Sequence, residues 1–352
     1  MAIDNKDKKV LNVPHLRFPE FSGEWENTEL QYIAPNICSG KDKPTSNGTV
    51  ALYGSTGIIG MTRLASYNEE IVLVARVGAN AGQLQITTIP CGVTDNTLII
   101  NAKEWNRYIY YYLQHYNLNR LVFGSGQPLI TGSMLKKLKI IYGEESERNK
   151  IVNLLCLLDE RIATQNKIID KLQSLIKGIA QNITCSNKPN VHISECLECN
   201  SSTLQESDVC ENGAYPVYGA NGVVGYLNYY NTLSEAIYII KDGSGVGTVS
   251  YVTGKCSPTG TLNILQVKDG YSLRYLYYLL KVFNFEPYKT GMAIPHIYFK
   301  DYGKAKIFCP QYSEQLKYAT LLFTIDDKLS TEQEILKSLN LEKQYLLRQM
   351  FI

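Results

Sequence analysis

The sequence predicts an α+β fold: two tandem α/β globular domains separated by two long helices that form an antiparallel coiled coil, with a pseudo-two-fold internal repeat. Three observations support this. Two long segments carry a heptad pattern of apolar residues, the polar exception in the first pattern recurs in the second, and a series of glycine and tyrosine motifs occurs twice in one order. The predicted parts are a first globular domain (1–143), a central helix (144–185), a second globular domain (186–309) and a C-terminal helix (310–352).

The first long helix is predicted over residues 147–183. Its apolar positions are separated alternately by four and three residues, which is the spacing of a coiled-coil seam. Such a narrow apolar stripe cannot be buried by one helix alone, so a partner helix is required. The seam positions are Ile151, Leu155, Leu158, Ile162, Gln165, Ile169 and Leu172.

The partner is predicted at residues 314–351, where the same seam recurs 167 positions later. Gln165 then corresponds to Glu332, and a polar seam residue of this kind fixes the register of two helices. Spacing alone leaves an alternative open, in which two unrelated amphipathic helices pack into separate cores. The recurring positions include Leu322, Ile325, Leu329, Glu332, Leu336 and Leu339.

Outside the helices, an ordered series of motifs is repeated. The segment from Asn47 to Gly60 recurs 165 positions later, and the tyrosine-rich helix that begins near Arg107 recurs 167 positions later. Several matches in one order indicate a tandem duplication. The period is too long for a solenoid, so two domains are predicted. The repeated tyrosines are expected in the core of their helices: Tyr108, Tyr110, Tyr111, Tyr275, Tyr277 and Tyr278.

Local patterns predict the elements of the first domain. Residues 1–20 resemble a tail, and 49–60 suggest a strand with a glycine-bounded loop. A buried strand is expected over 71–77, two short strands over 84–100, a helix over 104–118, and a loop followed by a strand over 123–140.

Composition bounds the class of protein. The chain has 352 residues, a net charge of +2 and 45% hydrophobic residues, which is typical of a globular protein with real cores. The near balance of charge permits a nucleic-acid partner without requiring one. Nine scattered cysteines, a charged N-terminus without an apolar core and the lack of a membrane-length apolar run favour a cytoplasmic location.

The duplication also predicts a geometry. Two copies related by a pseudo-two-fold axis would present two similar but non-identical surfaces at a distance fixed by the helices. DNA suits such an arrangement, because similar grooves recur about every 34 Å along the duplex.

Taken together, the motifs resemble the specificity subunit of type I restriction–modification systems. The resemblance runs from about Val13 to Phe351 and is carried by the order of the motifs rather than by any single one. Its tightest parts are IPHIYFKDYGKAKI (294–307), the Gly-Gln-Pro turn at 126–128, the two Tyr-Gly-x-x-Gly loops and the helix starts at Glu147 and Glu314. The halves depart from each other at GQPLITGS against GMAIPHIYF, and most strongly at 32–44 against 197–210.

The resemblance implies that each globular half is a target recognition domain for one half of a split, asymmetric DNA sequence. It implies that the coiled coil sets the spacer and docks methyltransferase subunits, two in number, and that a nuclease–translocase subunit can join. S-adenosylmethionine and ATP are then expected only in partner subunits, with no cofactor bound by this chain.

DNA contacts are predicted at the glycine-bounded loops and at nearby polar side chains. Glycine lets a backbone approach phosphates closely, asparagine pairs with adenine edges, and arginine reaches guanine or phosphate. Each glycine could equally form a plain turn, and each asparagine could serve only its backbone conformation. The candidates are Lys41, Lys43, Tyr53, Gly54, Ser55, Thr56, Gly57, Arg76, Asn80, Gln127, Tyr218, Gly219, Ala220, Asn221, Gly222, Ser244 and His296.

Catalytic motifs are not evident in the sequence. GSGVGTV (243–249) superficially resembles a dinucleotide-binding loop, but its counterpart GANAGQL lacks the middle glycine and no long helix pattern follows. Cys196, Cys199 and Cys210 lack an evident fourth zinc ligand, so free thiols are expected. Two alternatives remain at this stage: a two-headed scaffold that binds protein or glycan, and a stand-alone DNA methyltransferase or nuclease.

Overall fold

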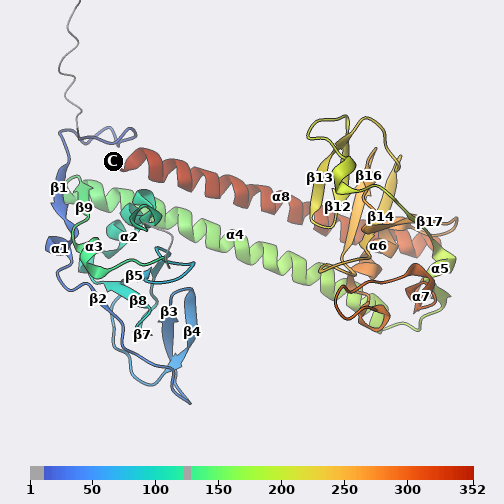
Figure 1. Cartoon of the computed structure of the whole chain (residues 1–352), viewed down its shortest axis with the longest axis horizontal. Helices are drawn as coiled ribbons and strands as arrows, with labels where there is room; N and C mark the ends of the chain where they lie inside the picture. The colour runs from blue at the N-terminus through green and yellow to red at the C-terminus, as the bar shows by residue number, and fades with distance from the viewer. Residues whose placement is uncertain (1–11, 123–127) are drawn as a thin grey trace, which may run out of the picture. The chain divides into compact units, whose positions relative to one another are not determined.

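The computed structural model describes residues 12–122 and 128–352. The chain divides into two compact units: unit 1 is Met1–Thr164 with Leu336–Ile352, and unit 2 is Gln165–Ile335. Each unit contains one globular domain and a segment of both long helices, α4 (Glu145–Cys185) and α8 (Tyr312–Met350) (Figure 1). The sequence predicts four parts, and each long helix is a separate part. In the structure, each long helix is instead divided between the two compact units.

The first domain contains nine strands within its described residues. They form a four-stranded sheet in the order β2-β8-β5-β6, a three-stranded sheet in the order β4-β3-β7 and a two-stranded sheet β1-β9. Among these described strands, the β3-β7 pair alone is parallel. The strands are β1 (Glu26–Glu29), β2 (Cys38–Ser39), β3 (Val50–Gly54), β4 (Gly57–Thr62), β5 (Val72–Ala75), β6 (Leu84–Ile86), β7 (Cys91–Val93), β8 (Thr97–Ile100) and β9 (Lys139–Tyr142).

The helices of the first domain are short apart from α2. Helix α2 packs against β5 and β6 of the four-stranded sheet. The helices are α1 (Leu30–Ile33), a 3-10 turn (Lys103–Trp105), α2 (Asn106–Tyr116), a second 3-10 turn (Leu118–Leu121) and α3 (Gly132–Lys136).

The second domain repeats this plan with each strand number raised by nine. Its sheets have the orders β11-β17-β14-β15, β13-β12-β16 and β10-β18. The strands are β10 (Val191–His192), β11 (Leu197–Ser201), β12 (Tyr215–Gly219), β13 (Gly222–Leu227), β14 (Glu235–Ile240), β15 (Val249–Thr253), β16 (Ser257–Pro258), β17 (Leu262–Val267) and β18 (Lys306–Ile307). The helices are α5 (Ile193–Cys196), a 3-10 turn (Glu206–Asp208), α6 (Leu273–Val282), a 3-10 turn (Glu286–Tyr288) and α7 (Phe299–Tyr302).

The duplication predicted from the sequence is confirmed at the level of strand pairing. Even a local irregularity is repeated: the register of the β3-β4 hairpin shifts between Leu52 and Tyr53, and that of the β12-β13 hairpin shifts between Val217 and Tyr218. A bulge that recurs in both copies is a designed feature of the fold rather than an accident of one loop.

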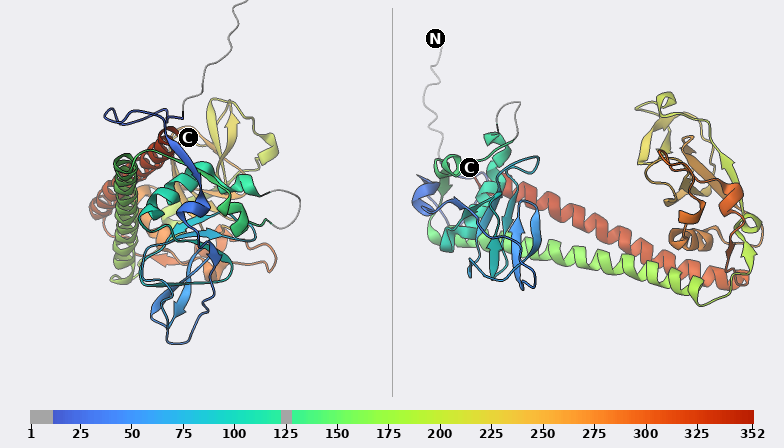
Figure 2. Two further views of the ribbon diagram at one scale, coloured as in Figure 1. Left: turned by 90° about the vertical axis from the view of Figure 1, so that its left-hand side faces the viewer. Right: turned by 60° about the horizontal axis from the view of Figure 1, so that its bottom comes forward.

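The coiled coil is confirmed as antiparallel by polar contacts inside each unit. In unit 2 the Gln165 side-chain amide donates to the Glu332 carbonyl oxygen at 3.0 Å and also to the Glu332 carboxylate. In unit 1 the Lys343 ammonium pairs with Asp159 at 2.6 Å. The earlier position on α4 therefore meets the later position on α8. All thirteen predicted seam residues are buried or half-buried, and in each unit the two helices lie side by side (Figures 1 and 2).

The core of unit 1 joins the sheet, α2 and both long helices. Ile151 and Leu155 from α4 lie in one apolar cluster with Leu347 from α8 and with Phe351. The Phe351 ring lies 5.5 Å from that of Tyr108 and 5.9 Å from that of Tyr112, measured between ring centroids. The prediction that the repeated tyrosines form helix core is confirmed, since five of the six are buried and Tyr110 is half-buried.

Three local predictions were wrong. Residues 12–20 are not a free tail, because Arg17 donates to both carboxylate oxygens of Glu147 and the Leu16 amide donates to the Gln349 carbonyl. The segment 84–100 contains three strands rather than two. Within 123–140, α3 precedes the final strand, because the Thr131 hydroxyl accepts from the Met134 amide at 3.3 Å and caps the helix.

Candidate nucleic-acid interface

The tip of the β3-β4 hairpin holds five of the predicted contact residues, and the structure separates them into two groups. Tyr53 is 6% exposed, and its hydroxyl binds Thr88, so this side chain holds the domain together. Gly54 is also buried. Thr56 is exposed, Ser55 and Gly57 are half-exposed, and Gly57 has a φ of +123° that favours glycine. The surface of this tip is therefore made by residues 55–57.

The β12-β13 hairpin has the same arrangement. Gly219 is buried and burial raises the pKa of the half-buried Tyr218, whose ring lies 6.0 Å from that of Tyr238. Ala220 is half-exposed, whereas Asn221 and Gly222 are exposed. The surface of the second tip is therefore made by residues 220–222.

The loops that follow β5 and β14 are closed by their own backbone. The Gly82 amide donates to the Ala75 carbonyl, and the Gly247 amide donates to the Ile240 carbonyl, both at 2.9 Å. The Gly78 and Gly243 amides donate to Pro128 and Pro295 at 3.0 Å. These four N–H groups are occupied by backbone carbonyls, so they are not free to bind phosphates. Asn80 and Ser244, at the tips of the loops, are exposed.

Arg76 directly follows β5 and lies next to the first hairpin tip. Its backbone amide and the Ser55 hydroxyl both donate to the Asn96 carbonyl, at 3.0 and 3.1 Å. Its side chain makes one hydrogen bond, from Nη1 to the Ser39 hydroxyl at 3.3 Å, and its buried Nε has no partner within the described part of the chain. A guanidinium with most of its five donors unused is well suited to an external acceptor.

Lys241 occupies the position of Arg76 in the second domain and is not among the contacts predicted from the sequence. The Lys241 amide donates to the Thr261 carbonyl at 2.9 Å, as the Arg76 amide does to Asn96. The Lys241 carbonyl accepts from Ile297 at 2.9 Å, as the Arg76 carbonyl does from Ile130. Applying the shift of 165 to Arg76 points to Lys241, so the signal was present in the sequence.

The structure brings His296 together with the Ser244 loop. His296 forms an isolated antiparallel bridge with Asp242, and its backbone exchanges two hydrogen bonds with Thr290. In the first domain the matching bridge joins Val77 and Leu129. The predicted contact at Gln127 lies outside the described residues.

Lys41 and Lys43 are exposed on the segment that follows β2. Between them, Asp42 turns inward, where its carboxylate accepts from the Val93 amide at 2.8 Å and from the Ser66 hydroxyl at 2.6 Å. The two lysines are therefore presented outward by an anchored backbone, which suits contact with phosphates.

Exposed apolar residues near both hairpin tips were also missed. Ile58 is 55% exposed and Ile59 56% exposed after the first tip, and Val223 is 49% exposed after the second. Each position belongs to a β-strand, where an apolar side chain is normally taken as part of the core, so the sequence pattern concealed them.

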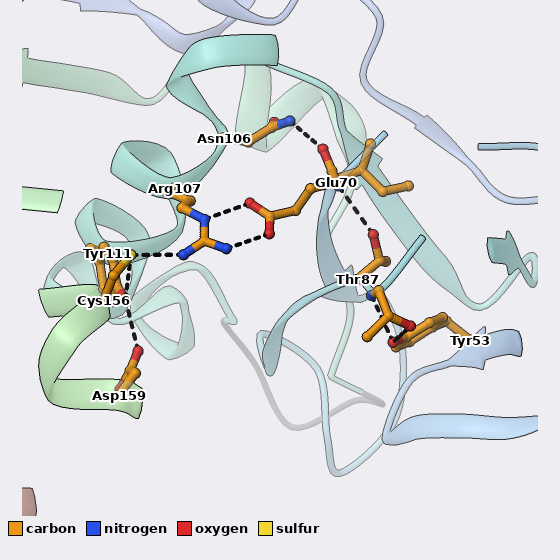
Figure 3. A network of polar contacts seen from close by, with 10 residues as sticks. Tyr53, Glu70, Thr87, Asn106, Arg107, Tyr111, Cys156 and Asp159 are labelled. Atoms are coloured by element: carbon orange, nitrogen blue, oxygen red, sulfur yellow. Dashed lines mark hydrogen bonds and ion pairs between the residues drawn. The ribbon is translucent and has the colours of Figure 1, made fainter. Parts of the chain in front are cut away.

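Behind the first domain's surface, a polar network ties α2 to the sheet and to α4 (Figure 3). Arg107 donates to both carboxylate oxygens of Glu70 at 2.8 Å and to the Cys156 thiol at 2.8 Å. The hydrogen bonds to Glu70 raise the pKa of the Arg107 guanidinium above its ordinary value. Tyr111 donates to Asp159 at 2.8 Å. The network fixes α2 against the sheet and α4.

Within the described residues, no group of three or more histidine, cysteine, aspartate or glutamate side chains is arranged to hold a metal ion. All nine cysteines are free thiols, including the three considered as zinc ligands. Over the same residues, none of the helices combines the length and the apolar character needed to cross a membrane.

Comparisons with known proteins identify the family. The family model described as "Type I restriction modification DNA specificity domain" matches residues 9–174 and 189–341, once in each half. A Mycoplasma genitalium protein named as a type I specificity subunit is 25% identical over 305 residues, 78% of this chain and 79% of that protein. The specificity subunit of an Escherichia coli type I restriction enzyme is 24% identical over 125 residues, 36% of this chain and 31% of that protein.

Solved structures show the same fold. The crystal structure of a type I restriction–modification S subunit from Mycoplasma genitalium superposes with a TM-score of 0.73 at 19% identity, covering 97% of this chain and 99% of that one. A structure from work on assembly and conformational transition of a type I system has a TM-score of 0.52 at 15% identity, covering 94% and 98%. The chain belongs to the type I DNA specificity family. Its role is that of a DNA sequence-specificity subunit in a restriction–modification complex.

Proposed function

We propose that each globular domain reads one half of a split, asymmetric DNA target. The two long helices set the distance between the half-sites and dock two methyltransferase subunits, and a nuclease–translocase subunit joins this assembly. The complex works on double-stranded DNA in the cytoplasm.

The main support for this proposal is that the two domains have the same backbone arrangement but different side chains at matched surface positions. Where the first domain has Arg76, the second has Lys241, and where the first has Ser55, the second has Ala220. Asn80 is matched by Gly245. Two copies that served one symmetric target would need the same contacts, so the differences favour two different half-sites.

The chemistry of these side chains supports direct contact with DNA. Arg76 retains donors that fit the two acceptors of a guanine edge or a phosphate, and Asn80 presents an amide that fits adenine. Lys241 carries a compact ammonium, which suits a phosphate or a single acceptor. The exposed isoleucines beside the first tip suit the methyl group of thymine or a sugar face.

Catalysis is proposed to lie in the partner subunits, which bring S-adenosylmethionine and ATP. The isolated, contaminant-free chain should show neither methyl transfer nor DNA cleavage, and activity should appear when a separate catalytic subunit is added. Robust methylation by the chain alone would show that it carries a catalytic site.

The test compares Arg76→Ala with Lys241→Ala in the assembled methyltransferase complex. Each variant should relax or weaken recognition of one half-site and leave the other unchanged, with a loss of about 1–3 kcal/mol of discrimination if a base is read. Matched controls are Lys139→Ala and Lys306→Ala, since these exposed lysines lie on the two-stranded sheets β1-β9 and β10-β18. Genome-wide methylation mapping provides the readout.

Replacing residues 1–143 with the equivalent part of a relative extends the same test. One half of the methylated sequence should change completely. A change in both half-sites would contradict independent reading. Binding that does not weaken as salt rises would favour a protein- or glycan-binding scaffold instead, because phosphate contacts release counterions.

A further inference from the structure

Helix α6 of the second domain and the two long helices line an open cavity that the proposed function does not use. The cavity measures about 450 Å³ and lies entirely within unit 2, between α4, α6 and α8. Its lining combines apolar side chains with two lysines and one aspartate. The lining residues used below are Ile176, Lys177, Tyr278, Lys281 and Asp326.

In unit 1, the place that corresponds to this cavity is filled by a lysine side chain. Asp159 accepts from the Tyr111 hydroxyl at 2.8 Å and pairs with the Lys343 ammonium at 2.6 Å (Figure 3 shows the tyrosine and the aspartate). The Lys343 ammonium lies 5.5 Å from the centroid of the Tyr111 ring, and its side chain is 17% exposed. A lysine side chain thus runs over a tyrosine ring and ends on a carboxylate.

In unit 2 the tyrosine and the aspartate are kept, but the lysine is missing. The Tyr278 hydroxyl donates to Asp326 at 3.2 Å, as Tyr111 does to Asp159. The position that corresponds to Lys343 is Ile176, whose side chain is buried and carries no charge. Asp326 has no ion-pair partner among the described residues, and it lines the cavity.

The two lysines of the cavity favour a ligand that also carries a negative charge. Lys281 lies against the Tyr277 ring, 5.1 Å from its centroid, and Lys177 is exposed at the same cavity. The site therefore combines a carboxylate without an ion-pair partner, a tyrosine ring beside apolar side chains, and two ammonium groups. A ligand with a positive charge at one end of an apolar stem and a negative charge at the other would match all three features.

We propose that this cavity binds a small ω-amino carboxylate. Its ammonium pairs with Asp326 in the way that Lys343 pairs with Asp159, its methylene stem lies along Tyr278 and Ile176, and its carboxylate faces Lys177 and Lys281. The cavity adjoins α6 and both long helices, so the bound molecule contacts the second domain and the coiled coil at once.

The experiment uses the whole 352-residue chain and ligand-observed NMR with 5-aminopentanoate, which has the same four methylenes as a lysine side chain. A dissociation constant on the order of 1 mM is expected for so few contacts. Pentylamine, which lacks the carboxylate, and pentanoate, which lacks the ammonium, should each bind at least fivefold more weakly. Equal binding of all three probes would overturn the proposal.

Two variants and one matched control locate the site. Asp326→Asn should weaken binding of 5-aminopentanoate at least tenfold, and Ile176→Lys should abolish it by placing an internal ammonium on Asp326. Asp159→Asn should leave the affinity within twofold of the original chain, because Lys343 already occupies that place. The proposal fails if Asp326→Asn binds normally, if Asp159→Asn loses binding, or if a folded Ile176→Lys chain still binds.

Discussion

In the first domain Arg107 donates to both carboxylate oxygens of Glu70 and to the thiol of Cys156. In the second domain the matching Arg274 reaches Glu235 with a single contact of 3.3 Å, and its guanidinium lies over the Phe323 ring at 4.2 Å. The two domains thus share strand order, hairpin bulges and a tyrosine–aspartate contact with a long helix, but this arginine meets its helix by different chemistry in each. Main-chain pairing constrains the duplicated fold, whereas side chains at individual contacts between domain and helix were free to diverge.

The largest expected effect comes from changing the helices that both domains share. One heptad inserted just before Gln165 and another just after Glu332 face each other in the antiparallel pair. They keep the seam facing inward and the Gln165–Glu332 contact intact, and they lengthen each helix by about 10 Å. Because DNA rises about 3.4 Å per base pair, the gap between half-sites should grow by one to three base pairs. Rotation of the duplex with each added pair favours the smaller values and weaker binding.

Methylation mapping of the lengthened complex measures the gap directly. The bases of both half-sites should stay the same, because no residue of either hairpin tip has been altered. An unchanged gap in a folded, active complex would mean that something other than the helices sets the distance.

The next largest effect is on stability and compares matched core positions. Leu155 on α4 and Leu322 on α8 are both fully buried. Alanine at either position should lower the free energy of unfolding by about 2–5 kcal/mol, since each leaves a cavity. Urea unfolding followed by domain-specific probes would show whether each loss falls on its own unit.

Leu157→Ala serves as the control for this pair, because Leu157 is 60% exposed on α4. Its effect should stay within about 0.5 kcal/mol. A loss below about 1 kcal/mol for only one of the two buried leucines would indicate that the units are not equivalent in packing.

A smaller effect should separate the two arginines. Arg107→Met should cost about 1 kcal/mol, because it removes a bidentate pair and a bond to Cys156. Arg274→Met should cost a few tenths of a kcal/mol, because its contact with Glu235 and its hydrogen bond to the Tyr251 hydroxyl are both long, at 3.3 Å. Double-mutant cycles with Glu70→Gln and Glu235→Gln would measure the two coupling energies. Equal energies would contradict the difference seen in geometry.

The smallest effect concerns acid stability at the centre of the coiled coil. Hydrogen bonds from Lys328 and Gln165 lower the pKa of the Glu332 carboxyl from its ordinary value near 4.5. The folded state therefore favours the ionised form, which stabilises the fold above pH 4.5 and ceases to do so as pH falls through the lowered pKa. Glu332→Gln should reduce the loss of stability between pH 5 and 3, measured by thermal unfolding. The exposed Glu334→Gln is the control and should leave the pH profile unchanged.

Regular patterns allowed the fold to be predicted, and irregular contacts were missed. The seam from Ile151 to Leu172 repeats so strictly that helix, partner and register follow from it. The strands are only two to six residues long, too short to show a clear alternation, so three were taken as two within 84–100. Helix α3 depends on a single cap at Thr131, and the position of residues 12–20 depends on Arg17 meeting Glu147 from 130 positions away.

For the candidate interface, the sequence predicted correctly which loops lie at the surface, but it did not predict the role of each residue within those loops. The hairpin tips and the Asn80 loop lie at the surface, but Tyr53 points inward and the loop glycines use their amides internally. Burial and hydrogen bonding of this kind depend on residues distant in sequence, such as Thr88 and Pro128. Lys241 could have been predicted by applying the repeat shift of 165 positions to Arg76.

The Gln165–Glu332 pair has a consequence for mispairing between chains. Since the two positions are equivalent in the repeat and face each other, each would face its own copy if two identical halves associated. Two first halves would place Gln165 against Gln165, and two side-chain amides can donate to and accept from each other. Two second halves would place Glu332 against Glu332, where two buried carboxylates repel at neutral pH. A single acidic residue thereby discourages self-association of one half and favours the internal pairing of unlike halves.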